Sequence, residues 1–229
     1  MGLATFIGGV HPYEGKELSM EHPITVLQPK GSEMVFPLVQ HIGAPAKPLV
    51  AAGDEVLVGQ IIAEAGGFIS ANVVSSVSGK VKKIEPRRVA NGSMVNSIII
   101  EDDKEYRTVE GFGERKDYTK LSKDEIRNIV KEAGIVGLGG AGFPTHVKLS
   151  PKNENEIDYI IVNGAECEPY LTSDYRLMME EPEKIIGGLK IILQLFPNAK
   201  GIIGIENNKP KAVEKLRELV KNESKIEVV

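Results

Sequence analysis

The segment from Gly137 to Lys148 holds the residues whose types and spacing best suit chemistry, because it combines closely spaced glycines with a following lysine. Glycines occupy positions 137, 139, 140 and 142. A main chain without side chains can approach a phosphate or a flat ring closely. Lys148 lies within reach and supplies positive charge. The pattern predicts that Gly137, Gly139, Gly140, Gly142 and Lys148 form part of a nucleotide or flavin site.

The loop matches neither of the common phosphate-binding loops. Gly137, Gly139 and Gly142 satisfy the spacing G-x-G-x-x-G, but the dinucleotide fingerprint needs a strand before the loop and a helix opening at its last glycine. Here a predicted helix precedes the loop and Pro144 follows it, and no Gly-Lys-Ser/Thr ends it as in a Walker loop. A flexible connection between a helix and a strand remains the structural alternative.

A second polar cluster, Asn163 to Glu168, directly follows the apolar run 159–162. Ligands of open α/β sheets bind outside the carboxyl ends of the strands, so we expect contacts here. Asn163 offers both a donor and an acceptor, and Glu166 and Glu168 alternate along the chain. The alternatives are a solvated acidic loop and, for Cys167, a small buried side chain that no neighbouring histidine is set to activate.

The elements around these clusters predict an α/β domain over residues 118–229. Ser122 and Glu125 have the spacing of a capping box, and Gly134 is placed to end that helix. Further elements are predicted as strands at 158–163 and 201–205 and as helices at 182–192 and 209–221. This alternation is typical of a layered, Rossmann-like fold with a parallel sheet. Residues 225–229 resemble the start of another strand. We therefore expect the domain to be truncated at its C-terminus, and the alternative is a domain that ends on a strand entering the sheet.

Residues 1–112 are rich in Gly, Val and Pro and predict an all-β domain. Residues 53–60 spell G-D-x-V-x-x-G-Q, and residues 78–81 spell S-G-x-V. Both motifs resemble the biotinyl/lipoyl-type barrel-sandwich hybrid family, whose carriers hold a modified lysine at a hairpin tip. No lysine occurs from Val56 to Gly79. The resemblance therefore favours a structural or docking role for this barrel over a swinging-arm carrier.

Composition excludes several function classes for these 229 residues. The formal net charge is -4, aromatic residues make up 5% and Trp is absent, which argues against a nucleic-acid partner. Cys167 is the single cysteine, so it can form no internal disulfide and cannot hold an iron–sulfur cluster alone. The apolar runs are too short to span a bilayer, and no direct membrane span is expected.

Taken together, the glycine loop and the polar cluster resemble the flavin- and NADH-binding subunit of respiratory complex I and its relatives. Residues 8–19, GGVHPYEGKELS, and residues 163–176, NGAECEPYLTSDYR, are similar to one relative in particular. That relative is the C subunit of the Rnf electron transport complex. The resemblance extends over essentially the whole chain.

The resemblance implies a role and a set of binding residues. Such subunits are peripheral, lie on the cytoplasmic side of the cell membrane, and pass electrons between NADH and ferredoxin with other Rnf subunits while ions are transported. By analogy FMN would lie against the glycines, Lys148 would contact its polar edge or phosphate, and Phe143 would face the NADH. Asn163 and Glu166 would hydrogen-bond the flavin, and Glu168 would help to place NAD(H). Hydride transfer of this kind requires no acid–base residue and no metal ligand from the chain.

The chain also departs from this family pattern. Ala165 stands where the complex I relative has an acidic residue. Family members continue with the rest of the flavin site and with motifs for two 4Fe–4S clusters, neither of which occurs in this sequence. We therefore expect the chain alone to be inactive as an oxidoreductase. The alternative function is a docking or assembly module that holds no cofactor.

Overall fold

The computed structural model describes residue 10, residues 12–27 and residues 31–229, so part of the N-terminal motif (Gly8, Gly9 and His11) lies outside the described residues. The chain packs into two compact units, one of residues 28–152 and one that joins residues 1–27 to residues 153–229. The predicted domain limits, 1–112 and 118–229, stay a prediction. Packing divides the chain elsewhere, because residues 113–152 pack with the β-rich part.

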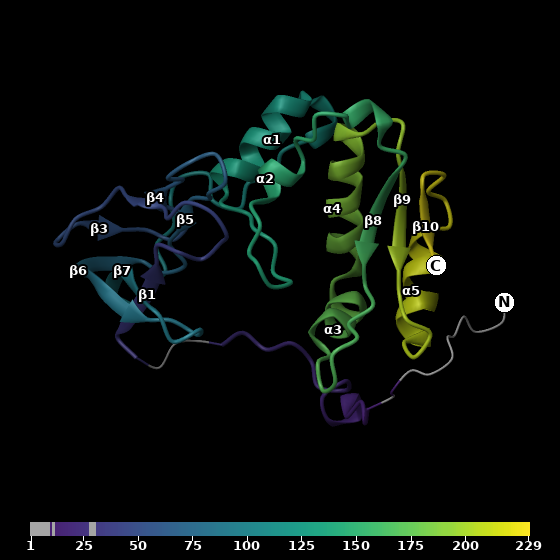
Figure 1. The fold of residues 1–229 in the computed structure, drawn as a ribbon, viewed down its shortest axis with the longest axis horizontal. Helices are drawn as coiled ribbons and strands as arrows, with labels where there is room; N and C mark the ends of the chain where they lie inside the picture. Colours follow the sequence, from purple (N-terminus) through teal and green to yellow (C-terminus); the bar gives the residue numbers. More distant parts are fainter. Residues whose placement is uncertain (1–9, 11, 28–30) are drawn as a thin grey trace. The chain divides into compact units, whose positions relative to one another are not determined.

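The unit of residues 28–152 is built from two antiparallel sheets (Figure 1). The larger sheet has the order β1-β7-β6-β3 and the smaller has the order β2-β4-β5. Their strands are β1 Glu33–Pro37, β2 Lys47–Pro48, β3 Glu55–Val56, β4 Ile61–Glu64, β5 Val73–Val74, β6 Gly79–Arg88 and β7 Met94–Asp102. The β-rich architecture predicted for this part of the chain is confirmed.

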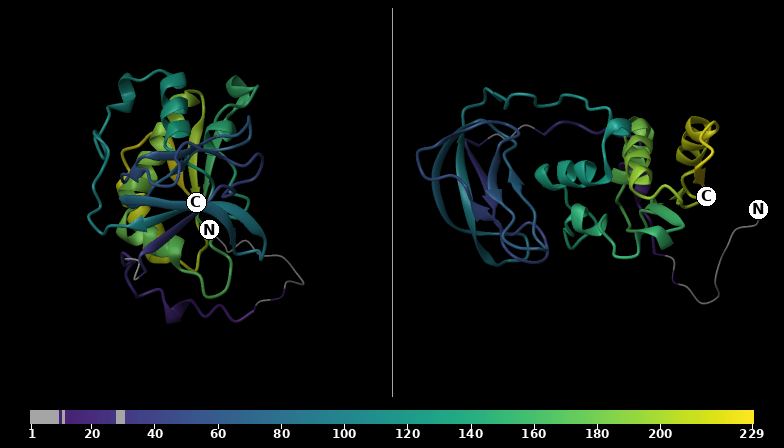
Figure 2. Two further views of the ribbon diagram at one scale, coloured as in Figure 1. Left: turned by 90° about the vertical axis from the view of Figure 1, so that its left-hand side faces the viewer. Right: turned by 90° about the horizontal axis from the view of Figure 1, so that it is seen from above.

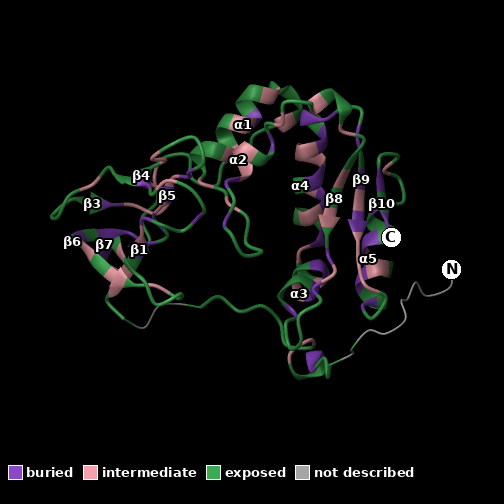
Figure 3. Cartoon of the chain, in the orientation of Figure 1, coloured by how far each residue is buried: buried purple, intermediate pink, exposed green. Residues whose placement is uncertain are grey.

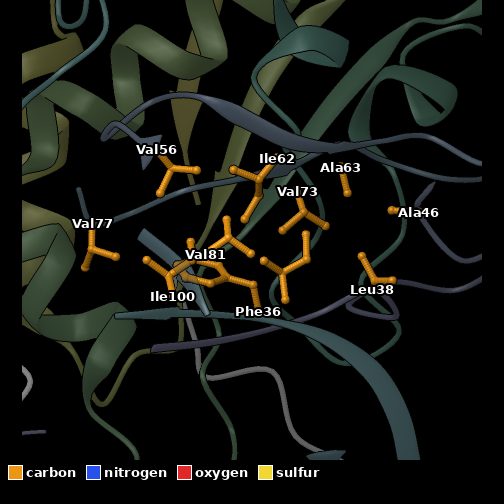
Figure 4. Close-up of a cluster of buried hydrophobic side chains, with 11 residues drawn as sticks. Phe36, Leu38, Ala46, Val56, Ile62, Ala63, Val73, Val77, Val81 and Ile100 are labelled. Carbon is orange, nitrogen blue, oxygen red and sulfur yellow. The ribbon is translucent and has the colours of Figure 1, made fainter. Parts of the chain in front are cut away.

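Small and branched apolar side chains from both sheets form the core of this unit (Figure 4). Val56, Ile62 and Ile98 are fully buried. Branched side chains pack well on a pleated surface, which is why valine and isoleucine dominate these short strands. The buried cluster consists of Phe36, Leu38, Ala46, Val56, Ile62, Ala63, Val73, Val77, Val81, Ile98 and Ile100.

Two helices and the glycine loop complete this unit. A short 3₁₀ turn, η2 (Tyr118–Lys120), leads into α1 (Lys123–Glu132). Helix α1 opens with the predicted capping box, in which Ser122 and Glu125 bond each other's main chain. Gly134 follows its end with φ +64°, as expected for a residue that ends a helix. The single-turn helix α2 (Thr145–Lys148) follows the glycine loop.

The other unit contains a three-stranded parallel sheet of order β10-β9-β8. Its strands are β8 Tyr159–Asn163, β9 Lys200–Gly204 and β10 Ile226–Val228. Its helices are α3 Ser173–Glu180, α4 Pro182–Leu195 and α5 Pro210–Val220, and a 3₁₀ turn, η3 Glu154–Glu156, precedes β8. Prolines at the first position of α4 and α5 suit helix starts, because that N–H has no partner within the helix. The mixed α/β and β class is confirmed; a Rossmann-like layering stays a prediction.

Helices α4 and α5 pack against one face of this sheet and against each other (Figure 2). Buried residues recur along α4, among them Ile186, Leu189 and Leu193 (Figure 3). On the opposite face of β8, Tyr159 is 57% exposed and Ile161 is 68% exposed. Asn163 shares that exposed face by the two-residue period of a strand.

The N-terminal segment belongs to the α/β unit. The 3₁₀ turn η1 (Lys16–Leu18) begins after Gly15, which has φ +62°. The ring of Tyr170 packs where a Gly15 side chain would stand, since a Cβ there would lie 2.3 Å from its Cε1 atom. Among the described residues, none of the helices combines the length and the apolar composition that a membrane span requires.

Candidate functional site

The glycine loop connects α1 to α2 and has a hydrogen-bonded stem. The Gly137 amide donates to the Phe143 carbonyl at 2.9 Å, and the Thr145 amide donates to the Ile135 carbonyl at 3.0 Å. Between these bonds the main chain turns through an exposed tip in which Leu138 is 97% exposed. The loop is therefore a defined turn on a fixed stem.

The glycines of this loop have different surroundings. A Cβ added at Gly139 or Gly140 would meet no described atom within 4 Å, so their main chain faces open space. A Cβ at Gly137 would make only ordinary contacts with Phe143, at 3.7 Å. Gly142 is buried, and its Cβ would lie 2.6 Å from the Gln40 carbonyl oxygen. Gly139 and Gly140 thus leave main chain free for a ligand, whereas Gly142 is required by packing.

Side chains that could meet a ligand follow the loop. Phe143 is 36% exposed, and Lys148 is exposed at the end of α2. Within the described part of the chain, the Lys148 ammonium makes no ion pair or hydrogen bond. His146 lies between them, and its Nδ1 atom is buried without a described partner. Burial, with a smaller effect of the Lys131 charge, lowers the pKa of His146 and favours the neutral ring.

The strand exit begins at Asn163, where β8 ends. The Asn163 side-chain oxygen accepts a hydrogen bond from the Ala165 amide at 3.0 Å, which turns the chain away from the sheet. The Gly164 amide donates to the Gly204 carbonyl at 2.8 Å and extends the pairing with β9 by one bond. Asn163 is exposed, and its side-chain NH₂ has no partner among the described residues. That donor is available to a ligand.

Glu166 has a structural task in this loop. It is 7% exposed, and its φ is +50°. Its carboxylate accepts from the amides of Asp174 at 2.6 Å and Tyr175 at 3.1 Å, and from the Ser173 hydroxyl at 3.4 Å. These bonds satisfy N–H groups at the start of α3 that have no partner within the helix. A direct bond from Glu166 to a flavin stays a prediction, since the described contacts of its carboxylate are with α3.

Glu168 and Cys167 are exposed on the outer side of this loop. The Cys167 sulfur lies 3.9 Å from a Glu168 carboxylate oxygen. Nearby, burial and then the charges of Glu166 and Glu168 raise the pKa of Asp174. The strand exit is therefore acidic, and the positive charges that balance it come from elsewhere in the unit.

Two buried lysines that sequence reasoning missed supply those charges. The Lys16 ammonium donates to the carbonyls of Glu166 at 2.7 Å, Glu168 at 2.9 Å and Leu171 at 2.8 Å. Lys209 is 2% exposed and donates to the Ala165 carbonyl at 2.5 Å. Each ammonium thus fixes the main chain of the strand exit. No local signal marks Lys16, because its partners lie at least 150 residues further along.

The predicted site residues fall in both compact units. Gly137, Gly139, Gly140, Gly142, Phe143 and Lys148 lie in the unit of residues 28–152. Asn163, Glu166 and Glu168 lie together in the α/β unit. In the first unit these residues lie in the glycine loop and in α2, and in the second they lie at the end of β8 and in the loop that follows it. The convergence of the two loops on one ligand stays a prediction.

Comparison with known proteins gives two family matches and a consistent set of relatives. Residues 4–105 match the RnfC barrel sandwich hybrid domain, and residues 130–229 match the Nuo51 FMN-binding domain. The chain is 44% identical over 227 residues to the C subunit of the proton-translocating ferredoxin:NAD(+) oxidoreductase complex of Clostridium ljungdahlii, covering 99% of this chain and 49% of that protein. It is 43% identical to the Na(+)-translocating counterpart of Acetobacterium woodii, covering 98% of this chain and 50% of that protein.

A more distant relative and one solved structure extend the comparison. The C subunit of the ion-translocating oxidoreductase complex of Vibrio cholerae is 37% identical, covering 94% of this chain and 28% of that protein. The crystal structure of an NAD+-reducing NiFe hydrogenase matches 47% of this chain and 20% of that one at 25% identity, with a TM-score of 0.38.

Along the chain, a match to the barrel sandwich hybrid domain of RnfC is thus followed by a match to an FMN-binding domain. The chain belongs to the RnfC family. It spans about half the length of the first two curated relatives that it matches.

Proposed function

We propose that this chain is the part of an Rnf-type electron-input subunit that binds FMN and NAD(H). One observation carries the proposal: the main chain at Gly139 and Gly140 is open to a ligand, on a stem that is itself hydrogen-bonded. A bare main chain on a rigid support suits a flat ring or a phosphate. The match to a flavin-binding domain over residues 130–229 supports FMN as that ligand.

Each of the predicted site residues would have its own role in binding the cofactors. Gly139 and Gly140 would lie against the flavin, with Gly137 at the stem and Gly142 holding the loop in place. Lys148 would neutralise a phosphate or the polar edge of the ring, and the Asn163 side-chain NH₂ would donate to the flavin. Phe143 offers an apolar surface on which adenine can stack. Glu168, exposed in the loop that follows β8, would help to orient NAD(H), and Glu166 would act by shaping the strand exit.

The bound flavin would supply the redox chemistry by accepting hydride from NADH, and the chain would supply position and electrostatics. Lys16 and Lys209 hold the carbonyls of the strand exit, so the loop need not reorganise when the ligand arrives. A preorganised site is a general source of both affinity and rate.

The wider role follows from the relatives and goes beyond this chain. We infer a peripheral position on the cytoplasmic side of the membrane, with other Rnf subunits as partners and ferredoxin as the distant electron partner. The 4Fe–4S clusters that carry electrons onward would belong to the part of such subunits that this sequence does not contain. The chain alone would then bind cofactor but not turn over NADH and ferredoxin.

Titration of the purified chain with FMN tests the proposal, because flavin fluorescence is quenched when the ring stacks in a protein site. We expect saturable quenching, and Lys148→Ala should raise the Kd about tenfold, the loss of one charge-assisted hydrogen bond. Lys152→Ala is the matched control, since Lys152 is an exposed lysine nearby. Absence of quenching in the wild-type chain would favour the alternative, a docking or assembly module without cofactor.

A further inference from the structure

The returning limb of the glycine loop rests on the β-rich part of its own unit. The Ile42 amide donates to the Ala141 carbonyl at 2.9 Å. The next residue, Gly142, has φ +61°, and a Cβ there would lie 2.6 Å from the Gln40 carbonyl oxygen and 2.9 Å from the Cα of His41. Only glycine allows so close an approach, so this limb is seated on residues 40–42.

The outgoing limb rests on a second part of the same barrel. Gly134, just before the loop, has φ +64°, and a Cβ there would lie 2.5 Å from the Asn72 carbonyl oxygen. The Asn72 side-chain NH₂ donates to the Glu132 carbonyl at 3.4 Å, at the end of α1. Residues 65–72, between β4 and β5, therefore support the other end of the stem.

Hydrogen bonds made by the side chains of His41 and Ser70 connect the two supporting segments to each other. His41 is 7% exposed; its Nε2 atom accepts from the Ala71 amide at 3.1 Å, and its Nδ1 atom lies 3.1 Å from the Ile42 carbonyl oxygen. This pairing fixes the neutral tautomer with the proton on Nδ1. Ser70 adds a bond from its hydroxyl to the Ala44 carbonyl at 2.8 Å.

Asn72 joins this connection from the other side. Its side-chain oxygen accepts from the Ala65 amide at 3.0 Å, which closes the 65–72 turn, while its NH₂ reaches α1. One asparagine thus braces the turn of the barrel and the helix that leads into the glycine loop. The exposed tip of the loop has no comparable support, because a Cβ added at Gly139 or Gly140 would meet no described atom within 4 Å.

We propose that the barrel is the platform that fixes the glycine loop, and that His41 and Asn72 are positioning residues for ligand binding at Gly139 and Gly140. The ligand part of this statement rests on the proposed function. The turn at 65–72 joins β4 to β5 and contains no lysine. This turn supports the glycine loop. That support would be the function of a barrel that has no lysine for the attachment of a group.

Hydrogen exchange of the 229-residue chain without cofactor tests the platform directly. The reporters are the hydrogen-bonded amides of Gly137 and Thr145 in the loop stem. We expect His41→Ala, Asn72→Ala and Gly142→Ala to speed exchange in peptides covering residues 135–146 by about tenfold, as for a local opening. Exchange in β6 and β7 should stay unchanged. Equal exchange in the stem of all variants would overturn the inference.

Two matched controls accompany these variants. Gly139→Ala is the same change in the same loop, but into open space, and it should leave stem exchange unchanged. Asn91→Ala removes an asparagine whose oxygen bonds the Ser93 amide at 3.0 Å, away from the loop, and should also leave the stem unchanged. If His41→Ala also loosens β6 and β7, the comparison of Asn72→Ala and Gly142→Ala with these controls decides, because both keep the His41 ring.

FMN titration of the same proteins separates the two proposals. We expect His41→Ala and Asn72→Ala to raise the Kd for FMN about tenfold, because the loop keeps its sequence but is no longer fixed in the binding conformation. Asn91→Ala should bind as the wild type does. A wild-type chain that binds no FMN contradicts the proposed function, while the exchange comparison still tests the platform. FMN binding that is unaffected by loosening of the stem would contradict the positioning roles.

Discussion

Lys16 donates from its ammonium to the main-chain carbonyl of Glu166 at 2.7 Å, across 150 residues of sequence. Glu166 is held at its other end as well, because its carboxylate accepts from the first amides of α3. A residue with positive φ, fixed by its carbonyl and by its side chain, has little freedom to move. The strand exit that follows β8 is therefore a rigid turn built from distant parts of the chain.

Replacement of Lys16 by methionine should destabilise the α/β unit strongly. The side chain keeps its length but leaves three carbonyls without their shared donor. We expect a loss of about 3 kcal/mol in the free energy of unfolding, since a hydrogen bond to a charged group contributes about 1.5–3 kcal/mol. Urea unfolding followed by circular dichroism measures it.

Lys211→Met provides the control for that measurement. The Lys211 side chain is 69% exposed, and its ammonium lies 3.6 Å from a Glu21 carboxylate oxygen. Exposed ion pairs of this kind contribute little, so we expect a change below about 0.5 kcal/mol. Equal stabilities of Lys16→Met and Lys211→Met would show that the buried ammonium does not hold the loop.

Glu166→Ala should loosen the start of α3. Without the carboxylate, the amides of Asp174 and Tyr175 lose their described acceptor. Loss of a helix cap costs about 1 kcal/mol, and a charged cap at a buried end costs more. Hydrogen exchange of peptides covering residues 173–180 should accelerate, whereas Glu168→Ala, at an exposed position in the same loop, should leave it unchanged.

The glycine of the S-G-x-V motif should tolerate no side chain. Gly79 has φ +149°, and a Cβ there would lie 2.0 Å from the Glu101 carbonyl oxygen on the neighbouring strand. We expect Gly79→Ala to lower the melting temperature of the β-rich unit by about 10 °C or to prevent folding, because the strands cannot separate to make room. Gly53 has φ +100° but open space around it, so Gly53→Ala introduces backbone strain without a clash. We expect it to lower the melting temperature far less than Gly79→Ala does. Similar melting temperatures would refute the steric explanation.

Stability should fall with acid through His146. The pKa of His146 is lowered from 6.5 by burial and by the Lys131 charge. The folded state therefore favours the neutral ring. The part of the unfolding free energy that comes from this preference is fully present above pH 6.5 and is lost as the pH falls through the lowered pKa. We expect the unfolding free energy of the wild type to fall relative to that of His146→Leu from about pH 7.5 to about pH 5.5. A difference independent of pH would contradict the shift.

Local signals in the sequence predicted much of this fold correctly. The capping box of Ser122 and Glu125, the start of α4 at Pro182 and the parallel order of β8 and β9 are all confirmed. Each depends on residues within a few positions of one another or on the regular alternation of strands and helices. The uncovered main chain at Gly139 and Gly140 agrees with the same kind of reasoning, whereas Gly142 is buried by packing.

Elements that depend on distant partners were missed. Helix α3 has no cap from Thr172, and its first amides are satisfied by Glu166 from the preceding loop. Its short sequence buries only Tyr175 and Met178, too few residues to show a period. Lys16 resembles any surface lysine until the carbonyls that surround it are known. No pattern of neighbours encodes contacts of this kind.

The α/β unit takes its residues from both sides of the β-rich segment in the sequence. A single cut between residues 152 and 153 would leave Lys16 on one piece and its three carbonyl partners on the other. The β-rich segment can be excised cleanly only by two cuts and a graft that rejoins residue 27 to residue 153. An exchange of the β-rich segment that is meant to preserve the α/β unit must therefore keep Lys16 together with residues 153–229.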